Sequence, residues 1–303
     1  MPNTLAHLGV QGFITHTAIK DAEPKWIAFG CLIPDLPWIL QRAIAALLPQ
    51  IDGYELRLYA IAQASLGISL LLCGAAAFTS AAPAKVGRIL AFNVLLHLLL
   101  DACQIKWANG VHLIAPLSWQ LLSFGWFWPE SIPTVVLTLS GLIYMIWAIP
   151  RQPACSTAPY ARPVWQWVAA IGLAAAYVLA PMGLRHGPYA HDNHYMQTLR
   201  NHPQRTGRQV EMDRRPYTPR DRDATVTTLV DEQIRVSSQP LPHAATVSLR
   251  GTFIDPDTIR IDALHEHWPW FRDGASYLGI ILISVLWLKP VHPKRYLVQR
   301  NRL

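Results

Sequence analysis

Residues 97–116 read HLLLDACQIKWANGVHLIAP and place a histidine and an aspartate inside an apolar run that otherwise has the composition of a membrane span. His97 and Asp101 are four residues apart, so on a helix they lie on one face, one above the other. An ionisable side chain in hydrocarbon is costly unless it is paired or faces a polar cavity, which makes such residues candidates for a functional site. The pair therefore predicts a polar centre within an apolar helix.

The composition of the whole chain favours a membrane protein. Of the 303 residues, 51% are hydrophobic and 15% are charged, which is apolar for a soluble domain. A span needs about 20 mostly apolar residues to cross about 30 Å of hydrocarbon. About six transmembrane helices are predicted, at 26–49, 57–79, 86–105, 133–149, 163–184 and 274–288. Residues 5–19 are too short and polar to span, so we expect an interfacial or half-inserted helix there.

The distribution of Lys and Arg predicts an orientation, because positive charge collects in short cytoplasmic loops. Such charges lie before the first span, between the second and third, between the fourth and fifth, and after the sixth. The opposite short loops hold Arg57 and Lys106, and Arg42 lies inside the first span. We therefore expect an integral inner (cytoplasmic) membrane protein with both termini cytoplasmic and residues 185–273 extracytoplasmic.

Three domains follow from these patterns. Residues 1–184 form a helical membrane domain, residues 185–273 form an extracytoplasmic β-rich domain, and residues 274–303 form the last transmembrane helix and a basic cytoplasmic tail. The predicted fold class is mainly α, a polytopic helical membrane bundle with the small β-rich domain inserted before its last helix. The β-rich domain is predicted from period-2, β-branched runs such as ATVSLRGTFIDPDTIRIDALHEH, which suggest about five antiparallel strands and a barrel resembling an OB-fold.

The β-rich segment gives weak functional signals. Residues 186–273 contain 11 Arg, no Lys and 12 Asp or Glu, a net charge of −1, and no nucleic-acid partner is expected. The stretch RNHPQRTGRQVEMDRRPYTPRDR carries seven Arg, which could grip a phosphate, although a solvated loop with internal ion pairs is favoured. The motifs HDNH and HEH could bind a metal, but ordinary surface histidines are favoured.

The four cysteines, Cys31, Cys73, Cys103 and Cys155, have no paired spacing. They indicate buried small hydrophobic residues rather than a disulfide or zinc set.

Further carboxylate and imidazole groups lie upstream of the His97 and Asp101 pair. Asp35 belongs to GCLIPDLPW, where two prolines are expected to disturb helical hydrogen bonding. His7 lies in the N-terminal stretch TLAHLGVQGF. One divalent cation would satisfy the His97 and Asp101 pair, because an i, i+4 pair can chelate a metal from one helix. A hydrogen-bonded structural pair without a metal would satisfy it equally well.

These pieces, in order, resemble a known family. An N-terminal histidine, GxxxPDxxW, HxxxD and then NGVHLIAPLSW occur in this order in the integral-membrane metal-dependent hydrolases described as LexA-binding and inner-membrane-associated. The resemblance covers residues 1 to about 120. That family is distantly similar to zinc-dependent phospholipase C and P1 nuclease, whose His and Asp residues bind metal. The resemblance therefore implies His7, Asp35, His97 and Asp101 as metal ligands, with His112 and His16 as supplementary candidates.

The chain also departs from the family. Many members carry an HRGxTHS-like motif at the start of the second span, where this chain has LYAIAQASL, with Tyr59 and Ala64 in place of two histidines. A multi-metal site is therefore not expected, while a one-metal site remains.

Two functions remain open from the sequence. The first is a membrane-bound hydrolase in which a divalent metal, most simply zinc, activates water, and Asp35 or Asp101 orients that water or accepts its proton. Its substrate would be an ester or phosphoester of a lipid-like molecule. The alternative is a non-catalytic membrane protein whose β-rich domain binds a partner or lipid. A transporter is less favoured, because no inverted repeat is visible.

Overall fold

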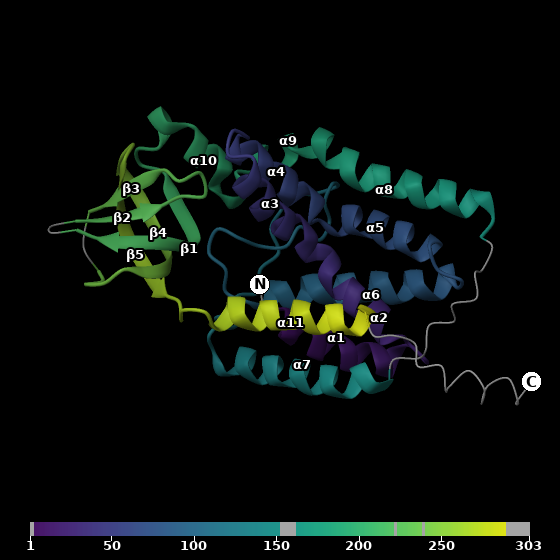
Figure 1. The fold of residues 1–303 in the computed structure, drawn as a ribbon. Helices are drawn as coiled ribbons and strands as arrows, with labels where there is room; N and C mark the ends of the chain where they lie inside the picture. Colours follow the sequence, from purple (N-terminus) through teal and green to yellow (C-terminus); the bar gives the residue numbers. More distant parts are fainter. Residues whose placement is uncertain (1–2, 152–161, 221–222, 238–239, 289–303) are drawn as a thin grey trace, which may run out of the picture.

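The structure, a computed structural model, describes residues 3–151, 162–220, 223–237 and 240–288. Figure 1 shows an elongated molecule in which a bundle of long helices carries a small β-barrel at one end. The chain is mainly helical, and the barrel precedes the last long helix in the sequence, as the sequence pattern predicted.

The helices of the bundle follow the apolar segments of the sequence. In chain order they are α1 (Thr4–Ala18), α2 (Pro24–Leu32), the 3₁₀ turn η1 (Ile33–Asp35), α3 (Leu36–Leu47), α4 (Gly53–Gln63), α5 (Leu66–Phe78), α6 (Pro83–Cys103), α7 (Ile132–Arg151), α8 (Val164–Leu184) and α11 (Phe271–Leu288). Four short helical elements lead into the barrel: α9 (His186–Ala190), η2 (Asn193–Tyr195), α10 (Met196–Arg200) and η3 (His202–Gln204).

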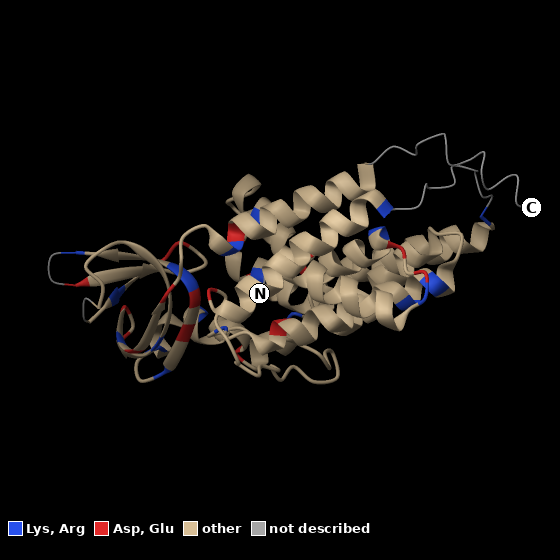
Figure 2. Cartoon of the chain, turned by 90° about the horizontal axis from the view of Figure 1, so that it is seen from below, with Lys and Arg blue, Asp and Glu red and all other residues tan. Residues whose placement is uncertain are grey.

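Within the part of the chain that the structure describes, five helical segments are long and apolar enough to cross a membrane: Pro24–Leu47, Pro83–Cys103, Ile132–Arg151, Val164–Ala190 and Phe271–Leu288. Together α4 and α5 would form a sixth, bent by 68° at its break. These six segments overlap the six predicted spans. Figure 2 shows that the long helices are largely free of charge along their middle, with Lys, Arg, Asp and Glu gathered toward the two ends.

The predicted second span is divided between α4 and α5. At the break Ser65 is extended, with φ −67° and ψ 155°, so the hydrogen-bond ladder cannot continue. The N–H of Leu66 instead donates to the carbonyl of His112 at 3.3 Å. His112 lies in the long connection between α6 and α7. Irregular backbone inside an apolar bundle is stable where protein satisfies it in this way. The break therefore anchors the 104–131 loop deep in the molecule.

The proline pair of the first span has a smaller effect than expected. Pro34 and Pro37 confine their disturbance to one 3₁₀ turn, η1, and Pro24–Leu47 continues as one helical segment. The turn places Asp35 at the junction of α2 and α3.

Helix α1 lies inside the bundle, not at its surface as an interfacial helix would. It packs against α2, α6, α7 and α11. Gly9 and Gly141 bring α1 and α7 so close that a Cβ on Gly141 would collide with the backbone of Leu5. The polar residues that argued against a span, including His7 and Gln11, face this interior. The N-terminal histidine is therefore carried to the centre of the helical region.

The β-domain is a closed five-stranded barrel. Its strands are β1 (Gln209–Pro219), β2 (Ala224–Thr227), β3 (Gln233–Val236), β4 (Ala245–Asp255) and β5 (Thr258–Glu266), in the spatial order β1-β2-β3-β5-β4. All neighbouring pairs are antiparallel except β3 and β5, a parallel pairing that the expectation of antiparallel strands missed. A five-stranded Greek-key barrel is also the architecture of OB-folds.

The barrel is fixed to the bundle through the 104–131 loop. The amide of Asn109 donates to Asp213 at 2.9 Å, and Arg214 pairs with Glu130 at 3.0 Å. The backbone N–H of Ala108 donates to Glu211 at 2.6 Å. These contacts hold strand β1 against the end of the bundle where α6 finishes.

Candidate metal centre and adjoining cavity

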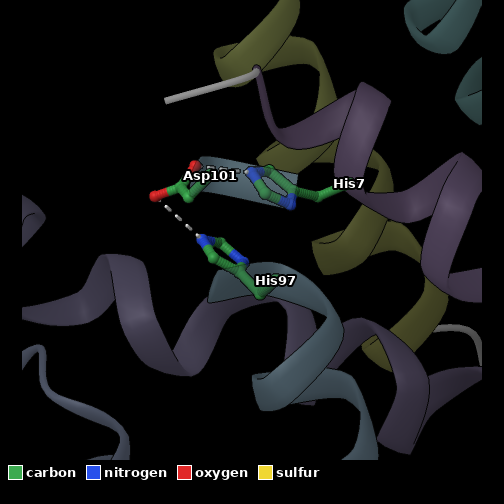
Figure 3. Close-up of side chains that lie close together, drawn as sticks. All are labelled: His7, His97 and Asp101. Carbon is green, nitrogen blue, oxygen red and sulfur yellow. Dashed lines mark ion pairs between the residues drawn. The ribbon is translucent and has the colours of Figure 1, made fainter. Parts of the chain in front are cut away.

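His7, His97 and Asp101 meet in the interior of the bundle (Figure 3). Their candidate ligand atoms lie within 4.8 Å of one another, and all three side chains are buried. Nε2 of His7 lies 3.3 Å from Oδ1 of Asp101, and Nε2 of His97 lies 3.9 Å from Oδ2 of the same carboxylate. The i, i+4 pair on α6 thus shares one face, and α1 adds the third side chain.

The ligand atoms of this cluster are poorly satisfied. Nε2 of His7 and Oδ1 of Asp101 face each other at 3.3 Å but form no well-aligned hydrogen bond, and both ring nitrogens of His97 are buried without a hydrogen-bond partner. Because buried polar atoms are almost always hydrogen-bonded, three poorly satisfied side chains with one candidate ligand atom each in the same small volume need an explanation. Ligand atoms around a tetrahedral zinc lie about 3.3 Å apart, since each bond measures about 2.0–2.1 Å. The residues present therefore fit a bound cation.

The rings of His7 and His97 stack on each other, with centroids 3.7 Å apart and planes 6° apart. For both to bind one metal ion, the rings must tilt so that their nitrogen lone pairs converge. Gln11 lies 3.3 Å from Nδ1 of His7 through its amide nitrogen, while its Oε1 is unpartnered. Turning that amide over would let Oε1 accept the Nδ1 proton and leave Nε2 free to bind metal.

Asp35 lies beside the cluster but outside the set of three. Its Oδ1 is 3.7 Å from Nε2 of His97 and has no hydrogen-bond partner. The predicted four-ligand set is thus divided into three gathered side chains and one adjacent carboxylate.

Lys106 is a site residue that the sequence analysis used only as a topological charge. Its ammonium lies 3.0 Å from Oδ2 of Asp101, and its side chain is 7% exposed. The lysine occupies one carboxylate oxygen and leaves Oδ1 directed at His7. No local pattern indicated this contact, because it depends on the fold of the loop after α6.

The two supplementary ligand candidates, His16 and His112, lie in different parts of the molecule. His16 contacts Tyr144 and Trp147, away from the cluster. His112 lines a cavity of about 280 Å³ that also has Asp101 in its wall. Of the two positions that replace family histidines, Ala64 lines the same cavity, whereas Tyr59 donates from its hydroxyl to the carbonyl of Val178.

The cavity lies between the bundle and the barrel. Its walls come from η1, α3, α4, α6, α11, the 104–131 loop, η2, strand β1 and the connection after β2. The polar and aromatic lining consists of Trp38, Gln41, Arg42, Arg57, Asp101, Lys106, Asn109, His112, His194, Asp213, Arg214, Arg215 and Arg272. The candidate metal centre thus borders a polar chamber through Asp101.

His194 is buried in this wall, although the HDNH motif suggested a surface histidine. It is 6% exposed, adopts a left-handed backbone with φ 58°, and stacks on Trp38. A guanidinium N–H of Arg57 donates to its Nδ1 at 2.9 Å, so the ring proton belongs on Nε2, which has no partner. A left-handed backbone at a non-glycine residue is strained and is often found at functional sites.

The arginine-rich stretch is also not the solvated loop that was favoured. Much of it forms strand β1, and it contributes Arg214 and Arg215 to the cavity. Arg205 is buried and pairs with Glu232. Asp221 and Arg222 of this stretch lie outside the described residues.

Among the described residues, two other groups of His, Asp or Glu side chains have candidate ligand atoms close enough together to hold a metal ion: Glu130, His265 and His267, and His202, Glu232 and Asp257. In the first, His267 has both ring nitrogens engaged, one with Ser248 and one with Glu130, each at 2.8 Å. In the second, His202, Glu232 and Asp257 are exposed or half-buried, and Glu232 is held by Arg205. Both groups have satisfied side chains, unlike the cluster in the bundle.

The cysteines agree with a structural role where they can be described. Cys31 and Cys73 are buried, Cys103 is half-buried, and all three are free thiols. Cys155 lies outside the described residues.

No protein-family model matches the chain, and no curated protein or solved structure matches it significantly. The chemistry of the site therefore rests on its own side chains.

Mild acid is expected to destabilise the protein through His194. Burial and the nearby Arg57 hold the pKa of His194 well below 6.5. Below pH 6.5 the unfolded chain takes up a proton that the folded chain does not, so stability is lost as pH falls, by up to about 1.4 kcal/mol per pH unit. Thermal unfolding at pH 7.5 and 5.5 should show a smaller loss in His194→Gln than in wild type. An unchanged loss would contradict this assignment. His243→Gln, which alters an exposed imidazole, is the control.

Proposed function

We propose that this protein is a membrane-embedded, metal-dependent hydrolase that acts on an ester or phosphoester. The observation that carries the proposal is the buried cluster of His7, His97 and Asp101, whose candidate ligand atoms lie within 4.8 Å of one another without well-aligned hydrogen bonds. Ionisable groups gathered in an apolar interior are expensive and are often retained for binding or catalysis.

Membrane insertion is supported by the outward faces of the long helices. Large apolar side chains are exposed there, for example Ile143 on α7 (61%), Ile171 on α8 (66%) and Ile281 on α11 (57%). Contiguous apolar surface of this extent needs an apolar medium or a partner to cover it. A lipid bilayer covers all these helices at once.

The proposed location is the inner membrane, with the end of α11 on the cytoplasmic side. The start of α1 lies beside Thr138 and Ser276, near the barrel ends of α7 and α11. The same orientation would therefore place the start of α1 toward the extracytoplasmic side, unlike the cytoplasmic N-terminus that the loop charges predict. The α1–α2 and α5–α6 turns and the adjoining ends of α7 and α8 lie at the end of the bundle away from the barrel (Figure 1). The short connections at that end carry most of the Lys and Arg residues from which the orientation is predicted. The barrel and the cavity would then lie on the extracytoplasmic side.

Zinc is the metal we assign first, because imidazole and carboxylate ligands suit it. A bound zinc would lower the pKa of water and polarise the substrate oxygen. His7, His97 and Asp101 would hold the ion, and Lys106 would orient Asp101. Asp35 has an unpartnered oxygen beside His97 and is the carboxylate available to orient water and accept its proton.

The hydrolase class itself rests on the resemblance of residues 1 to about 120 to the membrane-bound hydrolases. The absence of histidine at Tyr59 and Ala64 limits the proposal to one metal. A non-catalytic protein, in which Lys106 and the histidines merely neutralise Asp101, is the competing function.

Hydrolysis by the detergent-purified protein tests the proposal. Wild type stripped with a chelator should be inactive toward aryl ester and aryl phosphoester reporters, and zinc should restore release of the aryl alcohol. The same preparation of Asp35→Asn should remain inactive with zinc while keeping its fold. Folded, zinc-loaded wild type that hydrolyses neither reporter nor short-chain lipid analogues would favour the non-catalytic function.

A further inference from the structure

The cavity beside the candidate metal centre is strongly cationic. Six Lys and Arg side chains line it against two Asp side chains. The cations are Arg42, Arg57, Lys106, Arg214, Arg215 and Arg272, and the acids are Asp101 and Asp213. Like charges lining one chamber repel one another and raise the local concentration of anions. The chamber is therefore suited to an anionic ligand.

Part of this charge is already neutralised. Lys106 pairs with Asp101, and Arg214 pairs with Glu130, each at 3.0 Å. Asp213 accepts hydrogen bonds from Asn109 and from Ser248, both at 2.9 Å. These contacts hold the walls in place and explain only some of the positive groups.

Arg57 and Arg215 are two of the four arginines that remain, and their surroundings leave them suited to an anion. The guanidinium of Arg57 is hydrogen-bonded to the neutral side chains of Gln41, Asn109 and His194. For Arg215, no ion pair is found among the described residues, and its half-buried side chain lines the same chamber. Arginine presents a planar fork of donors that matches phosphate oxygens, which makes this pair the expected anion clamp.

Unpartnered polar side-chain atoms line the same wall. Nε2 of His194, Nε1 of Trp38 and both ring nitrogens of His112 are buried and have no hydrogen-bond partner. His194 and Trp38 each offer an N–H donor, and a neutral His112 offers one donor and one acceptor. His112 and His194 are only 4% and 6% exposed. The N–H groups among them are available to donate to the oxygens of a ligand bound in the chamber.

A distortion in strand β1 aims the arginines. The register of β1 against β4 shifts between Met212 and Arg215, and Arg214 adopts a left-handed backbone with φ 50°. A bulge turns side chains that would alternate across a regular strand. Arg214 and Arg215, adjacent in the chain, thus both line the chamber.

A second, smaller cavity leads from this chamber toward the apolar surface. It measures about 80 Å³ and lies between α3 and α11. Trp38, Arg42 and Arg272 line both cavities, while Ile39 and Tyr277, which are 41% and 58% exposed, line the outer one. The outer cavity also has Thr4, Asp35, Asp273 and Ser276 in its wall, so its lining is mixed. Its exposed apolar side chains lie where α3 and α11 would face hydrocarbon, an arrangement that suits an amphipathic molecule.

We infer that the chamber binds the phosphate headgroup of a membrane lipid, whose hydrocarbon chain leaves between α3 and α11. That this lipid is the substrate rests on the proposed hydrolase function. That the chamber binds the lipid does not, because binding needs no turnover. In turnover, water oxygen bonds to phosphorus and the bond from phosphorus to the lipid oxygen breaks. One water proton reaches that lipid oxygen and the other stays on the released phosphate, so the products are a lipid alcohol and phosphate.

Calorimetric titration of the full-length, detergent-purified protein in a chelator tests the inference without metal or turnover. The probes are dioctanoyl phosphatidic acid, uncharged dioctanoyl glycerol and inorganic phosphate. The phosphatidic acid should bind more tightly than either other probe. Arg215→Gln should weaken its binding about 10-fold or more, because a hydrogen bond to a charged group is lost. Arg260→Gln, which removes an exposed arginine from the barrel, should leave it unchanged.

A second variant tests the outer cavity separately from the arginines that bind the phosphate. Ile280→Trp should weaken the phosphatidic acid and leave inorganic phosphate unaffected, since Ile280 lines only the outer cavity. Equal affinity for dioctanoyl glycerol, or an unchanged affinity in folded Arg215→Gln, would overturn the anion site. Equal affinity for inorganic phosphate would overturn the lipid as its source. Phosphatidic acid binding in a protein that never hydrolyses it would leave this inference standing and reject the proposed function.

Discussion

Replacing His97 with alanine is expected to abolish stoichiometric zinc binding. The side chain supplies a buried ring nitrogen that faces Asp101 and has no hydrogen-bond partner in the folded chain. Loss of a neighbour that merely supports a metal ligand weakens metal affinity 10–100-fold, so loss of a ligand should exceed about 100-fold. His7→Ala should behave in the same way, although His7 lies 90 positions away in the sequence.

Elemental mass spectrometry on protein purified in detergent and supplied with zinc measures this effect. His16→Ala is the matched control, because it removes another histidine of α1 that contacts only Tyr144 and Trp147 among its ring neighbours. Asp35→Asn should retain most of the metal, since Asp35 lies outside the cluster of three. A folded wild type that binds no zinc would make the cluster a structural pair, and a loss in His16→Ala would show that the metal is held elsewhere.

Removing the guanidinium of Arg205 is expected to destabilise the barrel by about 2–3 kcal/mol. This is less than the roughly 3–5 kcal/mol for a fully buried ion pair, because the side chain of Glu232 is 28% exposed and water would solvate part of its charge. Arg205 is 1% exposed. It pairs with both oxygens of Glu232, at 2.6 and 2.7 Å, and also donates to the carbonyls of Pro256 and Leu199. Arg205→Met would leave the carboxylate of Glu232 without its partner and the carbonyl of Pro256 without this donor, while the carbonyl of Leu199 would keep the hydroxyl of Tyr54.

Hydrogen exchange of the barrel strands in the full-length protein resolves this change from the stability of the bundle. The double variant Arg205→Met/Glu232→Gln should recover part of the loss, because it removes the unpaired charge. Arg260→Gln breaks an exposed pair with Asp262 and should change stability by less than about 1 kcal/mol. Equal protection in wild type and Arg205→Met would mean that the buried pair contributes nothing to the barrel.

Local patterns predicted the parts of this protein that depend on neighbours along the chain. The six apolar segments follow from hydropathy, and the shared face of His97 and Asp101 follows from the helical period alone. The strand-rich character of residues 209–266 follows from period-2 alternation. The charges of the connecting loops also lie in the sequence, and they carry the proposed orientation.

Tertiary packing decided what those elements enclose. Close approach of Gly9 and Gly141 buries α1 and so brings His7 to Asp101, which hydropathy could not reveal in a helix that looked interfacial. The parallel contact of β3 with β5 closes the barrel, and a bulge in β1 turns two consecutive arginines toward Arg57 and His194. Period and hydropathy determine which face of an element is apolar. Which element packs on that apolar face depends on complementary shape and on hydrogen bonds to buried polar groups. Both involve residues far apart in the sequence, so they are decided only when the chain folds.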